Sequence, residues 1–268
     1  MAVITISRGS FSGGKMLAEC LAHELGYRCI DRDVIVEKAA AAGASQESLR
    51  EALAKPPTFW DRFTHTRYRY LTIIQAALCE EVSGGSAVYH GNAGHLLLHG
   101  VSHVLRARIV APIGFRTATV QERLKLPYDG AVAYIERMDR DRERWTQYLY
   151  NVDWRDPSLY DIVLNLEALN IRQACLVIAT TVRQDCFAET EESRAAMRDL
   201  MVASRVRAAL AVDEATQAFE LQVTASDGAV SVIGKLPRDA NVRAIEEVAL
   251  RVAGVSSVEF GVFGPAEA

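Results

Sequence analysis

The feature that most constrains the fold is a glycine-rich turn near the start of the chain. The heptapeptide GSFSGGK, Gly9–Lys15, has the spacing G-x-x-x-x-G-K and follows a β-branched run from Val3 to Arg8. Apolar residues then recur at helical spacing from Lys15 to Leu25, and Gly26 ends that pattern. Strand, glycine-rich turn and helix in this order are the context in which such a turn binds phosphate.

The physical basis of this motif is local. Glycines let consecutive backbone N–H groups point toward one anion, and the helix N-terminus adds partial positive charge. Lys15 can reach the outer phosphates as a mobile cation. The alternative is a glycine-rich strand-to-helix junction without a ligand. We expect phosphate and ATP to contact Arg8, Gly9, Ser10, Phe11, Ser12, Gly13, Gly14, Lys15 and Met16.

One position departs from the motif. Met16 stands where a Ser or Thr hydroxyl normally ligates Mg²⁺ beside the β- and γ-phosphates, and a thioether cannot take that role. We expect ATP as the cofactor. Either Mg²⁺ is then held by water and other groups, or the site binds phosphate with weakened or no catalysis.

Predicted strands and helices alternate up to about residue 182, which predicts an α/β fold whose mainly parallel sheet is covered on both faces. The polar segment 183–195 predicts a linker, although its second half is also compatible with the start of a helix. A helix–strand–strand–helix–strand order follows and predicts a small α+β unit. We therefore predict two domains, at residues 1–185 and 196–264.

Composition narrows the class of protein. The 268 residues can bury a core without a disulfide or metal, and they contain no apolar run long enough for a transmembrane helix. The five cysteines are scattered without a CxxC spacing, and no signal peptide is visible, which predicts a cytoplasmic protein with reduced thiols. The net charge of −4 argues against a nucleic-acid partner. We expect a nucleotide or another small molecule as the ligand, and no membrane partner.

The segment VITISRGSFSGGKMLAECLAHELGYRCIDRDVI, residues 3–35, resembles the opening of the cytidylate kinase-like proteins, which are P-loop kinases related to nucleoside monophosphate kinases. The similarity continues in order through 88–98, through 108–112 with Arg116, at Asp139-x-x-Arg142 with Tyr148, and through 154–165. It covers roughly residues 1–182.

This resemblance implies transfer of the γ-phosphoryl group of ATP to a nucleotide-like acceptor. It implies catalytic roles for Lys15, Arg142, Asp139 and Arg137, and acceptor contacts from Asp31, Arg32, Asp33, Asn92 and Arg116. Asn92 follows Gly91 where the family tends to have an arginine, so one cation for the acceptor phosphate is missing.

Each of these assignments has a simpler alternative. The run RMDRDRER, residues 137–144, is equally compatible with a solvated helix carrying ion pairs. Asp33 is also suited to capping a helix. For the chain as a whole, the alternative function is a nucleotide-binding sensor or regulatory protein with weak or no catalysis.

A group of histidines and an aromatic, arginine-rich segment offer two further patterns. His90, His95, His99 and His103 have spacings that could place imidazoles on one helical face, but Gly100 interrupts it and no Cys or carboxylate lies nearby, so we expect no metal site. The aromatic and arginine-rich segment 59–70 could stack a base, although core packing is the favoured interpretation.

The C-terminal segment, about 199–262, resembles a BON domain. The similarity rests on Val206-x-x-x-Leu210, on alternating apolar residues in 219–223 and 230–234, on Asp227-Gly228, and on Val252-x-Gly254-Val255-x-x-Val258. Asp227-Gly228 predicts a hairpin turn. The acidic character of this unit does not favour anionic lipid. We expect a regulatory, ligand-binding or oligomerising module, and a homo-oligomer is compatible with that role.

Overall fold

The computed structural model of this chain describes residues 1–41, 44–54, 66–91, 93–219, 221–234 and 241–261. Its internal contacts divide it into two compact units. The first contains the described residues within 1–34 and 85–190, together with residue 54. The second contains the described residues within 35–53, 57–84 and 191–268.

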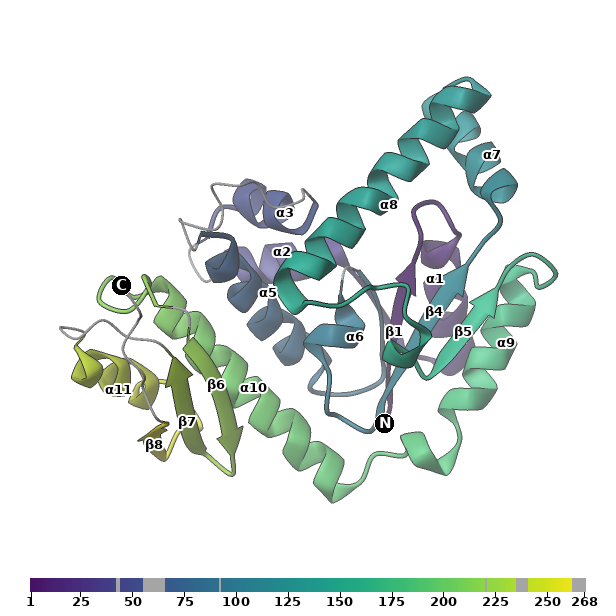
Figure 1. Cartoon of the computed structure of the whole chain (residues 1–268). Helices are drawn as coiled ribbons and strands as arrows, with labels where there is room; N and C mark the ends of the chain where they lie inside the picture. The colour runs from purple at the N-terminus through teal and green to yellow at the C-terminus, as the bar shows by residue number, and fades with distance from the viewer. Residues whose placement is uncertain (42–43, 55–65, 92, 220, 235–240, 262–268) are drawn as a thin grey trace. The chain divides into compact units, whose positions relative to one another are not determined.

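A five-stranded parallel sheet forms the centre of the first unit. Its order is β2-β3-β1-β4-β5, so that β1 lies between β3 and β4. Figure 1 labels β1, β4 and β5 of this sheet. The parallel arrangement confirms the predicted α/β fold and brings the carboxyl ends of all five strands to one edge. The strands are β1 (Val3–Arg8), β2 (Arg28–Asp31), β3 (Ala87–His90), β4 (Val104–Val110) and β5 (Ile162–Asn165).

Helices of the first unit cover the sheet because their apolar residues recur on one side. Helices α1 and α9 bury Leu17, Leu21 and Ile178 against Ile4 and Ile6 of β1 in one continuous core. Helix α6 packs against β1 and β4, and α7 packs against α8. The helices of this unit are α1 (Gly14–Leu25), α6 (Gly94–Leu97), α7 (Ile113–Leu124), α8 (Tyr128–Tyr150) and α9 (Ile171–Val182), with 3-10 turns at Pro157–Leu159 and Asp185–Phe187.

The second unit combines two parts of the chain. Helix α2 (Arg32–Ala40) leads into it from β2, followed by α3 (Gln46–Ala54) and α5 (Thr66–Val82). Helix α10 (Glu191–Val212) packs along α5, where Arg205 lies 3.2 Å from the Glu80 carboxylate and Arg207 donates to Gln75 at 3.2 Å. Since α10 begins at residue 191, the second half of the predicted linker is helical.

The C-terminal part of the second unit is a small α+β arrangement, as predicted. Strand β7 pairs antiparallel with β6 and parallel with β8, and one apolar core joins this sheet to α10 and α11. Asp227 and Gly228 both adopt positive φ, at 48° and 83°, which confirms the predicted turn between β6 and β7. The elements are β6 (Leu221–Ser226), β7 (Ala229–Gly234), α11 (Val242–Leu250) and β8 (Ser257–Phe260).

Within the described ranges, no helix is both long enough and apolar enough to cross a bilayer.

A buried polar network supports the site end of the first unit. The Tyr160 hydroxyl donates to the Trp154 carbonyl at 2.7 Å and lies 3.1 Å from Ser7 Oγ and 3.2 Å from His95 Nε2. The Arg108 guanidinium also donates to the Trp154 carbonyl and stacks on the Trp154 ring, 4.4 Å from its centre. Burial, and then the charges of two neighbouring arginines, lower the pKa of His95 to about 3.

The first prediction concerns His95 and acid stability. A histidine that charges near pH 6.5 when unfolded but only near 3 when folded makes the unfolded chain bind the extra proton. The stabilisation that neutral His95 contributes is therefore fully present above about pH 6.5. Below that pH this group lowers the free energy of unfolding by up to about 1.4 kcal/mol per pH unit. His95→Gln should lose less unfolding free energy than wild type between pH 7 and 5, measured by urea denaturation.

The matched control is His23→Gln, which changes an exposed histidine in the last turn of α1. It should leave the pH dependence close to that of wild type. Equal slopes for wild type and His95→Gln would contradict the assignment.

Candidate functional site

The glycine-rich turn joins β1 to α1 as the motif predicts. Phe11 and Gly13 adopt left-handed backbone angles, with φ of 62° and 81°, and the amide of Leu17 donates to the Gly13 carbonyl at 3.1 Å to open the helix. Arg8, the last residue of β1, lies against Gly14, where a Cβ atom would come within 1.9 Å of Arg8 Cδ. The absence of a side chain at Gly14 is therefore what lets Arg8 occupy this space.

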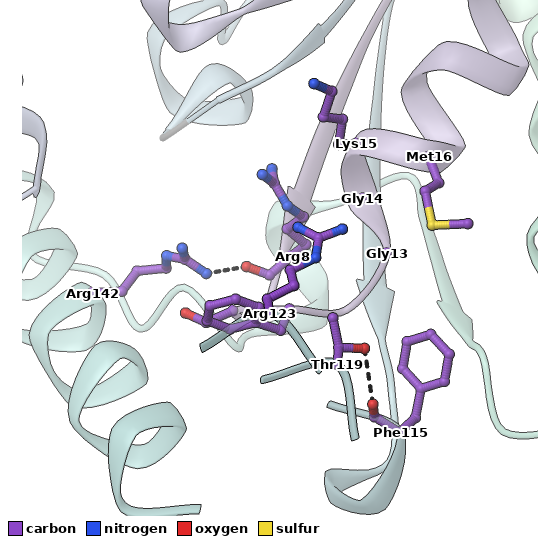
Figure 2. A pocket seen from close by; sticks show the side chains of 11 residues that line it. Arg8, Gly13, Gly14, Lys15, Met16, Phe115, Thr119, Arg123 and Arg142 are labelled. Atoms are coloured by element: carbon purple, nitrogen blue, oxygen red, sulfur yellow. Dashed lines mark hydrogen bonds between the residues drawn. The ribbon is translucent and has the colours of Figure 1, made fainter. Parts of the chain in front are cut away.

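A cavity of about 250 Å³ opens beside the turn (Figure 2). Its charged lining is entirely cationic: Arg8, Lys15, Arg123 and Arg142 contribute to it, and no carboxylate does among the described residues that line it. An all-cationic cavity at a helix N-terminus suits a polyanion. The lining residues are Arg8, Ser10, Phe11, Gly13, Gly14, Lys15, Met16, Phe115, Thr119, Arg123 and Arg142.

Most of the residues expected to contact phosphate are among these lining residues, and two are not. Gly9 lines a neighbouring cavity, and Ser12 is buried beneath the turn. The hydroxyls of Ser10 and Ser12 are both buried and have no hydrogen-bond partner. Ser10 also lines the cationic cavity, with its unpaired hydroxyl buried beside it.

Arg142 reaches the cavity from the long helix α8. Its guanidinium donates to the backbone carbonyl of Arg8 and lies 5.3 Å from the centre of the Trp154 ring. Burial, and then the charge of Arg8, lower the pKa of Arg142 to about 10, so it stays protonated at neutral pH. Two cations held this close favour a bound anion between them.

Arg116 and Asp139 both form hydrogen bonds with Ser10 of the turn, and we call this pair of residues the clasp. Arg116 donates from Nε to the Ser10 carbonyl at 2.7 Å and from Nη2 to Asp139 Oδ2 at 2.6 Å. Asp139 Oδ1 accepts the Ser10 amide at 3.2 Å. Helices α7 and α8 thus fix both backbone groups of Ser10. The resemblance implies an acceptor contact for Arg116 and a catalytic role for Asp139; the structure pairs the two with each other.

The side chains around the turn do not fit Mg²⁺ held in the usual way. P-loop proteins hold the ion by a loop Ser or Thr hydroxyl and by an Asp elsewhere. Met16 occupies the loop position, and Figure 2 shows it leaving the start of α1 in a different direction from Lys15. The strands that flank β1 end in His90 and Val110, neither of which offers a carboxylate. In the described part of the chain, His, Cys, Asp and Glu form no cluster of three or more that could hold a metal.

The remaining predicted residues lie elsewhere. Asp31 accepts the amides of Asp33 and Val34 at 2.9 and 3.0 Å, and so caps α2 from the end of β2. Arg32 and Asp33 form the first turn of α2. The Arg137 guanidinium lies 5.3 Å from the Tyr134 ring and lines neither cavity. Asn92 and residues 59–65 of the aromatic segment lie outside the described residues.

Sequence reasoning missed one side of the cavity. Phe115, Thr119 and Arg123 line it from α7, and none of them was proposed as a site residue. Their spacing of four residues places them on one face of a helix, which was a usable signal. The spacing identifies one face of helix α7, however, and only the packing of α7 shows that this face meets the phosphate turn.

A second cavity of about 310 Å³ lies on the other side of the clasp. Gly9, Arg108, Arg116 and Arg155 contribute to its lining, together with Asp139 and Trp154. Because it shares Arg116 and Asp139 with the clasp, a ligand in this cavity would contact the residues that hold the turn. It carries both signs of charge, unlike the cationic cavity.

The second prediction tests the approach of Arg8 to Gly14. In Gly14→Ala the new Cβ would lie 1.9 Å from Arg8 Cδ, so the Arg8 side chain has to leave its position. Affinity for ATP should fall about tenfold or more, since a charged hydrogen bond contributes about 1.5–3 kcal/mol. Isothermal titration calorimetry measures it.

Two variants control this experiment. Gly84→Ala adds a Cβ where nothing lies within 4 Å and should bind ATP as wild type does. In an Arg8→Ala background, Gly14→Ala should cost little further affinity, because the displaced group is already gone. Additive losses would contradict the argument.

Comparison with known proteins agrees with this architecture. Residues 3–168 match the model of the cytidylate kinase-like family, and residues 198–260 match the BON domain model. A cytidylate kinase of Ignicoccus hospitalis is 26% identical over 168 residues, which cover 62% of this chain and 90% of that protein. The crystal structure of an uncharacterized protein from Eubacterium ventriosum superposes with a TM-score of 0.53 at 18% identity, over 68% of this chain and 98% of the other, and so shares its fold. The chain belongs to the cytidylate kinase-like family and carries a C-terminal BON domain.

Proposed function

We propose that this protein transfers the γ-phosphoryl group of ATP to a nucleoside monophosphate or a related small acceptor. The observation that carries the proposal is the cationic cavity formed where β1 turns into α1. Family membership and the similarity to a cytidylate kinase support the same reaction class. We further propose that residues 1–185 form the domain that carries out the chemistry. Residues 196–264 would form a regulatory, ligand-binding or oligomerising module.

Phosphoryl transfer asks for positioning and positive charge rather than covalent help from the protein. In the proposed reaction Lys15 and Arg142 bind the outer phosphates and stabilise the charge that develops during transfer. The Arg116–Asp139 clasp keeps the turn in one conformation, so that the Ser10 backbone does not have to be ordered when the nucleotide binds. Arg116 and Asp139 therefore act as positioning residues in this scheme.

The proposed acceptor side is the edge of the sheet where β2 ends. Ligands of open parallel sheets bind beyond the carboxyl ends of the strands. Asp31 ends β2 there, and Arg32 follows it as a cation suited to an acceptor phosphate. A phosphate-bearing acceptor, such as a nucleoside monophosphate, matches that charge better than a neutral sugar or alcohol does.

One observation favours a second candidate function. The turn keeps its cationic cavity but has Met16 in place of the metal-binding hydroxyl. A site of this kind could bind nucleotide with little or no turnover and report it through the BON domain. We keep this nucleotide-sensing function as the alternative to the kinase.

The third prediction separates these candidates. Wild type should phosphorylate at least one nucleoside monophosphate with ATP, assayed with and without Mg²⁺. Lys15→Ala should lower the rate about a hundredfold, the usual effect of removing one charged donor from a transition state. Arg172→Ala is the control, because Arg172 is exposed on α9 and lines neither cavity described above.

The outcomes are distinct. Turnover lost in Lys15→Ala but kept in Arg172→Ala supports the kinase. ATP binding by calorimetry without turnover on any nucleoside monophosphate would contradict the kinase and favour the sensor.

A further inference from the structure

We infer that the cationic cavity binds a nucleoside polyphosphate in its metal-free form, with protein cations neutralising the charge that a divalent ion usually neutralises. This inference rests on the proposed function, because it concerns the same cavity. It goes further by naming the ionic form of the ligand. Three independent observations lead to it.

The first observation is that the loop position that normally supplies an oxygen ligand for Mg²⁺ holds Met16 instead. Mg²⁺ requires oxygen donors in near-ideal octahedral geometry. Met16 offers a thioether at the loop position, and its side chain is 52% exposed at the start of α1. His90 ends the neighbouring strand β3 and offers nitrogen rather than oxygen.

Two carboxylates at the site end of the sheet, Asp139 and Asp31, already accept hydrogen bonds, Asp31 on Oδ1 alone. Asp139 accepts a hydrogen bond on each oxygen, from Ser10 on one and from Arg116 on the other. Asp31 ends β2, which is separated from β1 by β3, and it caps α2 with two backbone hydrogen bonds. Moving either carboxylate to a metal would release groups that the fold holds in place.

The second observation is positive charge without close ion pairs, although Asp139 is near enough to raise the pKa of Arg142. In the ranges that the structure describes, Arg8, Arg123 and Arg142 form no ion pair with a carboxylate. Arg8 and Arg142 instead donate to backbone carbonyls, those of His90 and Arg8 respectively. Lys15 has Glu19 at 3.8 Å, but both side chains are more than half exposed, and such a pair contributes little.

An anion in the cavity would compensate the charge of these cations. Arg8 is close enough to Arg142 for its charge to lower the pKa of Arg142, although burial is the larger cause. A polyphosphate between them would relieve that repulsion without help from a metal. A bound Mg²⁺ would instead add its own charge beside four cations and be repelled by them.

The third observation is the unpaired hydroxyl of Ser10. The hydroxyl is buried and has no partner, and its residue lines the cavity. A phosphate oxygen is a fitting acceptor for it. The Ser10 hydroxyl and the four cations of the lining together form a donor set suited to phosphate oxygens.

The fourth prediction tests the metal dependence of binding. ATP is titrated by calorimetry into the full-length protein at fixed ionic strength, once with excess EDTA and once with Mg²⁺. We expect the dissociation constant in EDTA to equal or undercut the one in Mg²⁺. Binding that weakens tenfold or more in EDTA would overturn the inference.

A variant sharpens the test. Arg123→Gln removes one cation from α7 and should weaken ATP binding in EDTA about tenfold, while added Mg²⁺ restores part of the loss. Arg172→Gln, with the same change of charge outside the cavity, should bind as wild type does; circular dichroism verifies that both fold. Unchanged affinity of Arg123→Gln in EDTA would overturn the inference.

The result also separates this inference from the proposed function. Metal-independent binding without turnover keeps the inference and contradicts the kinase. Turnover together with binding that requires Mg²⁺ keeps the kinase and overturns the inference. Absence of ATP binding in both conditions overturns the inference as well.

Discussion

The contact on which the site depends is the approach of Arg8 to Gly14. An arginine at the end of a central strand can lie beside a helix N-terminus only if the first helical residue has no side chain. The missing side chain at Gly14 lets the Arg8 guanidinium lie next to the phosphate turn. The backbone carbonyl of Arg8 accepts a hydrogen bond from Arg142 of α8. The cationic character of the cavity therefore begins with a steric condition inside the turn itself.

The rest of the first unit holds this arrangement in place. The parallel sheet brings the end of β1 beside the ends of β3 and β4, while α7 and α8 fix Ser10 through Arg116 and Asp139. Two guanidinium groups contact the Trp154 ring, that of Arg108 at 4.4 Å and that of Arg142 at 5.3 Å from its centre. Buried hydrogen bonds to Tyr160 then fix the Trp154 backbone. The site is thus rigid where it meets the sheet, which is the condition for electrostatic preorganisation.

The two compact units do not coincide with the two family matches. Helix α5 lies within the segment that matches the cytidylate kinase-like family, yet it packs along α10 in the same unit as the BON domain. Helix α2 begins in the first unit and ends in the second. The chain therefore builds part of its kinase-like segment and its C-terminal domain as one body, through ion pairs and hydrogen bonds such as Arg205–Glu80 and Arg207–Gln75.

By itself the sequence determined what depends on neighbouring residues: the strand–turn–helix unit at Gly9–Lys15, the alternation of strands and helices, the Asp227–Gly228 turn and the missing hydroxyl at Met16. These follow from backbone preferences and periodicity, which act over a few residues. Only the tertiary structure decided which distant side chains meet. It paired Arg116 with Asp139, directed Arg123 to the cavity, and placed His95 beside the Tyr160 hydroxyl. Those choices depend on how helices pack on a sheet, and a one-dimensional pattern identifies the face of a helix but not the surface it meets.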